Sequence, residues 1–307
     1  MHTRLPLRIL LALAALTLPA SALLASERTQ SLRLMTYNIR LDIASDGPNA
    51  WPHRRQWVAD QVHWLHPDVF GMQEVRPNQK SDLIAALPGY RIFGEGREGK
   101  GEGEATPIGY DTQRFDFLDG ATFWLSPTPE IPAKAWDAAL PRIATWARLQ
   151  FKGSRQTLLA MNTHFDHIGQ VAREQSAAQI VRWIQDHAKP CEPVMLFGDF
   201  NSELDSKQMR TLTQGALALR DARGISKTPP FGPEGTFNEF HIAPTKSAPI
   251  DHVLVGDHVE VERYAVFTQV IDGRVPSDHF PVLVELKLES CQQAGASGTS
   301  PRNRDSG

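Results

Sequence analysis

Cysteine is scarce in this sequence, which excludes one way of holding a fold together. Only Cys191 and Cys291 occur in 307 residues, so a framework of several disulfides is not available. The chain does not need one, because 41% of its residues are hydrophobic and can fill a substantial core. In an oxidising compartment the two thiols could pair, and the sequence leaves both the paired and the free state open.

Long apolar runs are missing except near the N-terminus. Arg4 and Arg8 precede the apolar stretch 9–18, and a small-residue cleavage site follows at residues 20–22. This pattern predicts a signal peptide over residues 1–25, because the run is too short for a comfortable transmembrane helix. No cysteine follows the run, so a lipoprotein is not expected. We predict a periplasmic or secreted protein without stable membrane insertion, with an uncleaved anchor as the alternative.

An excess of positive charge is also missing. The formal net charge is −3, and loss of Arg4 and Arg8 with the signal peptide makes it −5. Proteins that bind nucleic acid nonspecifically usually carry a basic excess or stripe. Nucleic acid is therefore possible but not favoured as a partner, since metals and a few local arginines can still hold a phosphate.

Several well-known catalytic patterns do not occur. The chain has no internal repeat of fixed period, and no GxSxG elbow, Walker phosphate loop or HExxH pair. Residues 94–107 are glycine-rich and charged, with no apolar period, which predicts a loop that borders the pocket. Gly94, Gly96 and Gly99 formally match GxGxxG, but no helix is expected after them, so a dinucleotide site is not predicted.

Apolar periodicity predicts a strand-rich chain with few helices. Helices are expected over 51–67, 81–89, 172–188 and 206–215. About ten strands are expected within 32–41, 68–75, 108–126, 142–151, 156–165, 193–200, 235–241, 250–256, 261–269 and 280–288. Because many strands follow one another directly, we predict one domain over residues 31–289, with two packed sheets and helices outside. The small, polar residues 290–307 predict a disordered tail.

Polar side chains recur where apolar strands meet loops. Taken singly, each has the ordinary explanation of a turn cap or a structural histidine. As a set they predict one cluster of carboxylates, amides and imidazoles, whose hard oxygens suit magnesium or manganese. The residues are Asn38, Glu74, His164, Asp199, Asn201, Asp251, Asp278 and His279.

The motifs around these residues resemble, in order, those of the endonuclease/exonuclease/phosphatase superfamily. They read "TYNIR", "GMQEVR", "NTHFDH", "GDFNS", "IDHVLV" and "SDHFPV", and the resemblance spans about residues 32–288. It implies a deoxyribonuclease I-like fold, which is a four-layer α/β (or α+β) sandwich of two packed mixed sheets flanked by helices. The whole pattern looks most like a bacterial branch known as metal-dependent hydrolases.

The resemblance also implies a metal site. Glu74 matches the metal-binding glutamate, with Asn38 beside the metal. Asp278 matches an acid that orients the neighbouring imidazole or helps bind metal. The expected cofactor is Mg²⁺ or Mn²⁺, with Ca²⁺ as a further candidate.

Catalytic roles follow from the same motifs. Asp199 matches the acid that polarises the attacking water, and Asn201 matches its amide neighbour on the phosphate. His279 matches the imidazole that stabilises developing charge on the phosphate, and Asp251 an acid that supports a catalytic histidine. His164 matches the other histidine, as general acid or phosphate contact. Because Asp199 and Asn201 are two apart, an extended chain would place both on one side.

Four further residues are predicted to contact the phosphate ester. Arg40 and Arg76 stand where deoxyribonuclease I has arginines near its substrate, and Glu104 resembles the acid that pairs there with a catalytic histidine. Arg142 is a candidate from its place at a strand start. An ordinary strand-edge arginine explains it equally well.

These observations predict an exported, monomeric, metal-dependent phosphoesterase. The favoured function is hydrolysis of a small or glycan-linked phosphodiester by in-line attack of water. The first alternative is a phosphomonoesterase acting on a sugar, inositol or lipid headgroup phosphate. A secreted nuclease or sphingomyelinase-like enzyme is the second. An inactive binding module fits poorly, because no core motif residue is missing.

Overall fold

The structure is a computed structural model that describes residues 29–289. The predicted signal peptide, 1–25, and the predicted tail, 290–307, lie outside this range and stay predictions. None of the helices within the described range is long and apolar enough to cross a membrane.

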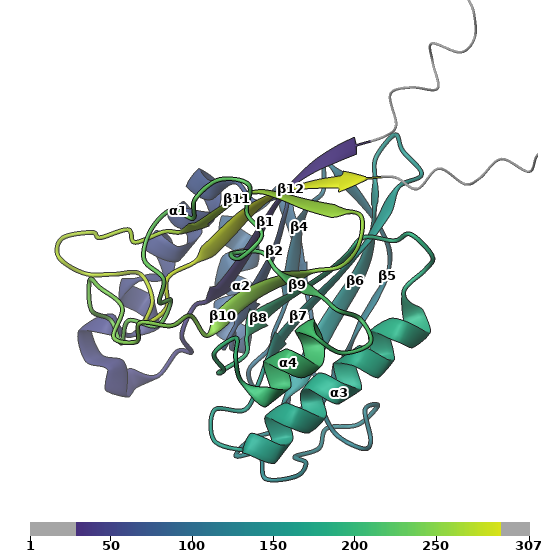
Figure 1. The fold of residues 1–307 in the computed structure, drawn as a ribbon. Helices are drawn as coiled ribbons and strands as arrows, with labels where there is room; N and C mark the ends of the chain where they lie inside the picture. Colours follow the sequence, from purple (N-terminus) through teal and green to yellow (C-terminus); the bar gives the residue numbers. More distant parts are fainter. Residues whose placement is uncertain (1–28, 290–307) are drawn as a thin grey trace, which may run out of the picture.

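Two six-stranded mixed sheets form the centre of the molecule (Figure 1). The first has the order β11-β12-β1-β2-β4-β3 and consists of β1 (Thr29–Asn38), β2 (Val69–Gln73), β3 (Tyr90–Phe93), β4 (Ile108–Asp111), β11 (Val259–Val266) and β12 (Val282–Glu289). The second has the order β5-β6-β7-β8-β10-β9 and consists of β5 (Phe115–Trp124), β6 (Ile143–Phe151), β7 (Thr157–His164), β8 (Val194–Asp199), β9 (Arg220–Asp221) and β10 (Asp251–Val255).

Helices cover the outer face of each sheet. On the first sheet, α1 (Arg55–Leu65) buries Val58 and Val62 against strands β1 and β2, and α2 (Pro77–Ala86) lies beside it. On the second, α3 (Gln170–His187) buries Ile180 and Ile184 against β7 and β8, with α4 (Lys207–Thr213) next to it. Two short 3₁₀ segments, Ala44–Asn49 and Trp51–His53, precede α1. The predicted four-layer sandwich is confirmed.

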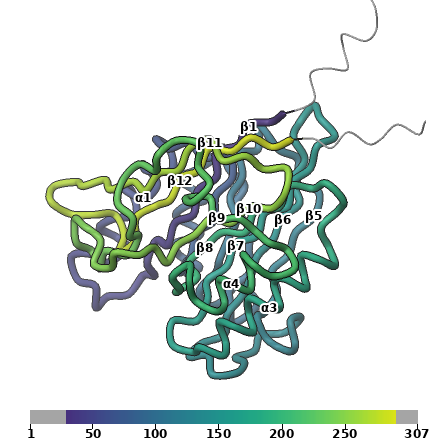
Figure 2. Tube along the Cα trace, viewed as in Figure 1, coloured from purple at the N-terminus to yellow at the C-terminus, as the bar shows by residue number. Residues whose placement is uncertain are grey.

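The central strands are apolar on both faces because both faces are covered. Every residue of β2, β8 and β10 is buried. One face packs between the sheets and the other packs beneath the helices, so these strands read as continuous apolar runs. The described chain ends lie side by side, since Thr29 pairs with Glu289 (Figure 2). Because β1 runs from Thr29 to Asn38, these ends are at the opposite end of the sheet from the polar strand ends.

The predicted strand over 235–241 was wrong. This segment is a loop, with Phe237 forming an isolated bridge to His279. Glu239 and Phe240 have φ values of 52° and 64°, and two left-handed residues in a row turn the chain out of any sheet. The short strands β3 and β9 were not predicted, because their few residues carry no clear period.

A buried amide joins the two sheets. Asn162 of β7 donates from Nδ2 to the carbonyl oxygens of Met72, at 2.8 Å, and Pro107, at 2.9 Å. Its Oδ1 accepts from Gln73 Nε2 at 2.7 Å. Asn162 and Gln73 are both fully buried, so these bonds form where water cannot replace them.

Cys191 precedes β8 and is disulfide-bonded, not a free thiol. Cys291 lies outside the described residues. The Cys191–Cys291 pairing therefore stays a prediction.

Gly71→Ala tests how closely the sheets pack. A Cβ at Gly71 would lie 2.4 Å from the ring of Phe197 and 2.5 Å from Cγ of Asn162. We expect a loss of about 2 kcal/mol in the free energy of unfolding, measured by urea denaturation, because overpacking forces a shift in both sheets. Gly89→Ala is the matched control, since a Cβ there meets nothing within 4 Å. Equal stability of the two variants would contradict the close packing.

Candidate active site

The polar strand ends converge at one edge of the sandwich. In the second sheet, parallel pairing of β7 with β8 sets His164 beside Asp199, and antiparallel pairing of β10 sets Asp251 on its other side. In the first sheet, Asn38 pairs with Gln73, and Glu74 follows directly. The strand register therefore collects these side chains, as the sequence predicted.

A cavity of about 290 Å³ lies at this edge. Nine of the predicted site residues line it: Arg40, Glu74, Glu104, Arg142, His164, Asp199, Asn201, Asp278 and His279. Asn38 and Asp251 are buried and hydrogen-bond to residues of the lining. Arg76 is exposed at the start of α2 and is not part of the lining.

Asp199 is a buried carboxylate held from two sides. Its Oδ2 accepts from Asn38 Nδ2 at 3.0 Å, and its Oδ1 accepts from the backbone N–H of Asn201 at 2.8 Å. Burial, followed by repulsion from Asp251, raises its pKa to about 7 against the opposing effect of His279. A carboxylate with this pKa can accept a proton near neutral pH.

The chain turns sharply around Asp199, which differs from the extended conformation that the spacing predicted. Gly198 has a φ of 147°, and a Cβ there would lie 2.0 Å from the carbonyl oxygen of Thr163. Asn201 has a φ of 46° and closes a turn onto Asp199. Asp199 and Asn201 do share the cavity, while Phe200 packs edge-on against Phe165. The two side chains share the cavity because the chain turns between them, and not because alternate residues of a strand face the same side.

His279 and Asp251 form a buried ion pair across the two sheets. His279 Nδ1 lies 2.8 Å from Asp251 Oδ2, which also accepts from Thr236 Oγ1 at 2.6 Å. Burial alone would lower the pKa of His279, but Asp251 and then Asp199 outweigh it and raise it to about 10. The imidazole is therefore a cation at neutral pH. Asp251, not Asp278, orients the ring, which corrects one of the two roles expected of Asp278.

His164 has the opposite electrostatic environment. Burial, followed by the positive charges of Arg142 and His279, lowers its pKa well below the ordinary value. The Asn201 amide donates to the Phe165 carbonyl at 3.0 Å and points the same nitrogen at His164 Nε2, at 3.1 Å. Nε2 therefore accepts a hydrogen bond, and the neutral ring carries its proton on Nδ1.

Glu74 and Asp278 flank one guanidinium at the opposite wall. Arg40 lies 3.9 Å from a carboxylate oxygen of each, while it binds Asp46 at 2.9 Å and 3.0 Å. Glu74 also accepts from Asn38 Nδ2 at 3.1 Å and from the Leu41 N–H at 3.0 Å. Burial raises the pKa of Asp278 to about 6, with Glu74 adding to it and His279 opposing it.

The residues present fit a divalent cation bound by oxygen. Four carboxylates, those of Glu74, Glu104, Asp199 and Asp278, line the cavity, and Asp251 lies behind them with its Oδ1 buried and without a hydrogen-bond partner. The ligand atoms of Asp199, Asp251 and His279 lie within 4.8 Å of one another and could surround an ion. We favour the side of Glu74 and Asp278, because a cationic His279 hydrogen-bonded to Asp251 is a poor metal ligand. Hard oxygens of this kind suit Mg²⁺ or Mn²⁺.

The glycine-rich loop supplies a residue that the sequence did not single out. Arg97 binds Glu104 through both terminal nitrogens, at 2.9 Å and 2.6 Å, and both residues line the cavity. Burial raises the pKa of Glu104 even beside Arg97. Glu104 thus forms an ion pair with Arg97 inside the loop, where the resemblance implied a histidine as its partner. No sequence signal marked Arg97, because its position depends on how this loop folds back.

Arg142 belongs to a second buried ion pair that was also missed. Its Nε lies 3.2 Å from Asp166 Oδ2, and its Nη2 lies 2.9 Å from His167 Nδ1. Asp166 also accepts backbone N–H groups from Ile168, at 3.0 Å, and Gly169, at 2.7 Å. The motif "NTHFDH" contained both residues, but only its first histidine was given a role. Other lining residues that were missed are Leu41, Leu140, Phe237, Lys246 and Ile250.

Three residues of the site are strained in the same way. Arg40, Glu74 and Asn201 have φ values of 57°, 62° and 46°, although none is glycine. Such conformations cost roughly 1–3 kcal/mol each and persist where surrounding contacts hold them. The loop conformation, and not regular secondary structure, therefore sets the direction of these three side chains.

Asp166→Asn tests the ion pair behind Arg142. Backbone N–H groups of Gly169, Ala139 and Ile168, together with Arg142, outweigh burial and hold the pKa of Asp166 below its ordinary range. Its charged form therefore stabilises the fold above a pH of about 4, and this contribution is lost as the pH falls through the lowered pKa. We expect the variant to lose about 2 kcal/mol of unfolding free energy at neutral pH.

The measurement is urea unfolding of both proteins at neutral and acidic pH. The difference between them should shrink in acid. Asp186→Asn, at an exposed position of α3, should unfold like the unchanged protein throughout. A difference independent of pH would contradict the charge-based explanation.

Solved structures of bacterial proteins are similar to this chain. An endonuclease/exonuclease/phosphatase family protein from Bacteroides thetaiotaomicron is 35% identical, with a TM-score of 0.81 over 85% of this chain and 99% of that one. The family protein from Bacteroides vulgatus is 36% identical, with a TM-score of 0.81 over 85% and 100%. A mannosyl-6-phosphatase from Bacteroides thetaiotaomicron is 36% identical, with a TM-score of 0.79 over 83% and 99%.

No protein of curated function matches the chain. The model of the Endonuclease/Exonuclease/phosphatase family matches residues 35–279, which contain every predicted site residue. Members of this family are phosphoester hydrolases that generally depend on a divalent metal. With its deoxyribonuclease I-like fold and this site, the chain belongs to the endonuclease/exonuclease/phosphatase family and is a phosphoesterase.

Proposed function

We propose that this protein is an exported, metal-dependent phosphomonoesterase whose substrate carries the phosphate on a sugar. The main evidence for this chemistry is the environment of Asp199. This residue is a carboxylate with a pKa of about 7, and it lies 3.8 Å from the cationic His279 in a cavity that Glu74 also lines. A proton acceptor, a fixed cation and a metal ligand therefore face the same small space.

The chain's own residues divide the reaction between them. Asp199 accepts a proton from the attacking water, and the amide of Asn38 with the backbone of Asn201 fixes the direction of its oxygens. His279 offers its Nε2–H to the phosphate, where it stabilises charge that develops during in-line attack. Asp251 keeps that ring cationic. His164 stays neutral and positions Asn201.

Glu74 and Asp278, with Asn38 behind Glu74, would hold the metal. When bound, Mg²⁺ or Mn²⁺ would neutralise charge on a phosphate oxygen. Arg40 is already paired with Asp46, so its 3.9 Å contacts leave both carboxylates available.

The size of the cavity favours a small substrate. Its volume of about 290 Å³ is at the lower end of the roughly 300–1,000 Å³ typical of ligand pockets. That space suits a sugar phosphate better than a polymer or a lipid chain. Arg97 and Arg142 add guanidinium groups to the wall, which suits the double charge of a phosphate monoester.

The similar mannosyl-6-phosphatase supports a sugar phosphate monoester over the small phosphodiester that the sequence favoured. A phosphodiester remains the second candidate, because the same residues can hydrolyse either. Export through the N-terminal segment 1–25 and a monomeric state are parts of the proposal that rest on the sequence.

Asp199→Ala and His279→Ala test the assigned chemistry. Each should lower kcat by about a thousandfold, the scale of a general acid or base, while circular dichroism and thermal unfolding show an intact fold. Asp186→Ala and His53→Ala are matched controls, because both positions are exposed, and they should keep full activity. Survival of activity in both site variants would overturn the assignment.

A substrate panel tests the ester class. Purified mature protein is given a hexose 6-phosphate, p-nitrophenyl phosphate and bis-p-nitrophenyl phosphate with magnesium, manganese or calcium. We expect the sugar phosphate to have the highest kcat/KM and chelation to abolish turnover. If the diester is hydrolysed faster, the proposal is wrong and the second candidate function, a phosphodiesterase, takes its place. No release from any of them would overturn both.

A further inference from the structure

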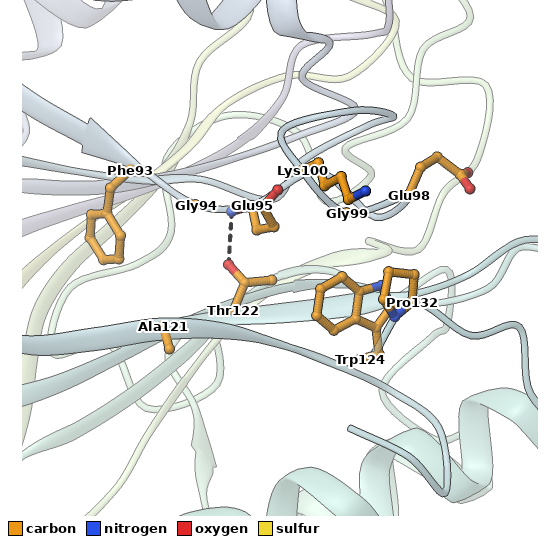
Figure 3. Close-up of a pocket in the computed structure, with 10 residues that line it drawn as sticks. All are labelled: Phe93, Gly94, Glu95, Glu98, Gly99, Lys100, Ala121, Thr122, Trp124 and Pro132. Carbon is orange, nitrogen blue, oxygen red and sulfur yellow. Dashed lines mark hydrogen bonds between the residues drawn. The ribbon is translucent and has the colours of Figure 1, made fainter. Parts of the chain in front are cut away.

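A second cavity lies on the other side of the glycine-rich loop. Its volume is about 600 Å³, roughly twice that of the catalytic cavity. Figure 3 shows the loop on one side and strand β5 with Pro132 on the other. None of the roles assigned above uses this space, and the two cavities have no lining residue in common.

The wall between the cavities is one ordered loop. Bridges pair Gly96 with Ala105 and Gly99 with Glu102, so residues 94–105 form a small hairpin. Arg97 lines the catalytic cavity, while Glu98 and Gly99 line the second one. Gly99 has a φ of +80°, and a Cβ there would lie 2.7 Å from Pro132, which leaves the loop seated against that proline.

Trp124 connects the two sides of the wall. It lines the second cavity, and its Nε1–H donates to the carbonyl oxygen of Arg97 at 2.7 Å. The backbone N–H of Glu95 donates to Thr122 Oγ1 at 3.0 Å, drawn as a dashed line in Figure 3. A ligand in the second cavity would thus touch residues that hold Arg97 in place.

The lining combines apolar rings with polar groups at the rim. Pro132 is exposed and Phe93 is half-buried, so these two give apolar surface beside the largely buried ring of Trp124, and Glu98 and Lys100 are exposed next to them. Apolar surface with a few directed polar groups is the usual make-up of a small-molecule site. Sugars match it, because their C–H faces pack on rings while their hydroxyls bond carboxylates and amines.

We propose that this second cavity binds a neutral oligosaccharide, namely the sugar residues that extend from the phosphorylated sugar in the catalytic cavity across the outer end of the loop, where Lys100, Gly101 and Glu102 are exposed. The inference rests on the proposed function. The charged residues that line the two cavities indicate which end of such a substrate each cavity would bind. The second cavity has the carboxylates of Glu95 and Glu98 against one ammonium, of Lys100, which disfavours a phosphate. The catalytic cavity has four carboxylates but also Lys246, the cationic His279 and three arginines, so it suits a phosphate better.

Ala121→Phe is designed to fill the second cavity. Ala121 is exposed on β5 and lines the cavity, and an aromatic residue suits a strand. Asp116→Phe is the matched control, since it adds the same ring at an exposed position of the same strand outside the lining. Both variants and the unchanged protein are assayed with a phosphorylated monosaccharide and with a series of longer oligosaccharides phosphorylated on the terminal sugar.

The expected result is selective. Ala121→Phe should raise KM for the longer substrates about tenfold, which corresponds to about 1.4 kcal/mol, and leave the monosaccharide unchanged. An unphosphorylated oligosaccharide should inhibit turnover of the long substrates competitively in the unchanged protein. Inhibition of the monosaccharide reaction instead would show that the free sugar occupies the catalytic cavity, and would overturn the inference.

Other outcomes separate the two proposals. If the monosaccharide phosphate is hydrolysed but chain length and Ala121→Phe change nothing, the second cavity does not bind the substrate, and the proposed function stands. If no sugar phosphate of any length is hydrolysed while another phosphoester is, the proposed function fails, and this inference fails with it. Equal effects of Ala121→Phe and Asp116→Phe would also overturn it, because the change would then not come from the cavity.

Discussion

The buried hydrogen bonds of Asn162 set the relation between the two sheets on which the active site depends. They tie β7 to Met72 of β2 and to Pro107 just before β4, close to where the sheets end in polar residues. Two catalytic contacts then cross the same gap: Asn38 to Asp199, and His279 to Asp251. Each would break if one sheet slid on the other. Close packing at Gly71 leaves no room for such a slide.

Burial then makes the chemistry possible. In water Asp199 and His279 would both have ordinary pKa values, and neither would suit its role. Burial, followed by repulsion from Asp251, raises the pKa of Asp199, while attraction to Asp251 and Asp199 outweighs burial and raises the pKa of His279. His164, only one strand away, stays neutral because burial, followed by the positive charges of Arg142 and His279, lowers its pKa. One cluster therefore contains a proton acceptor, a fixed cation and a neutral ring.

Residues at strand ends could be predicted from the sequence, and residues on loops could not. Asn38, Asp199 and Asp251 follow or begin apolar runs, so their convergence needed only the assumption that those strands are neighbours. Arg97 lies between β3, which ends at Phe93, and β4, which begins at Ile108, on a hairpin whose course the local sequence does not specify. His167 likewise follows β7 in a turn and was passed over beside the stronger signal of His164.

The sequence by itself determined the chemistry of this protein, because the order of short motifs at strand ends is specific even when each motif is weak. It also determined the two-sheet architecture, because many of the predicted strands follow one another directly without a helix between them. Only the tertiary structure decided which acid orients His279, that Glu104 pairs with Arg97, and that Asp199 and Asn201 meet through a turn. Those outcomes depend on distances across the sheets and on burial, neither of which is encoded by neighbours along the chain.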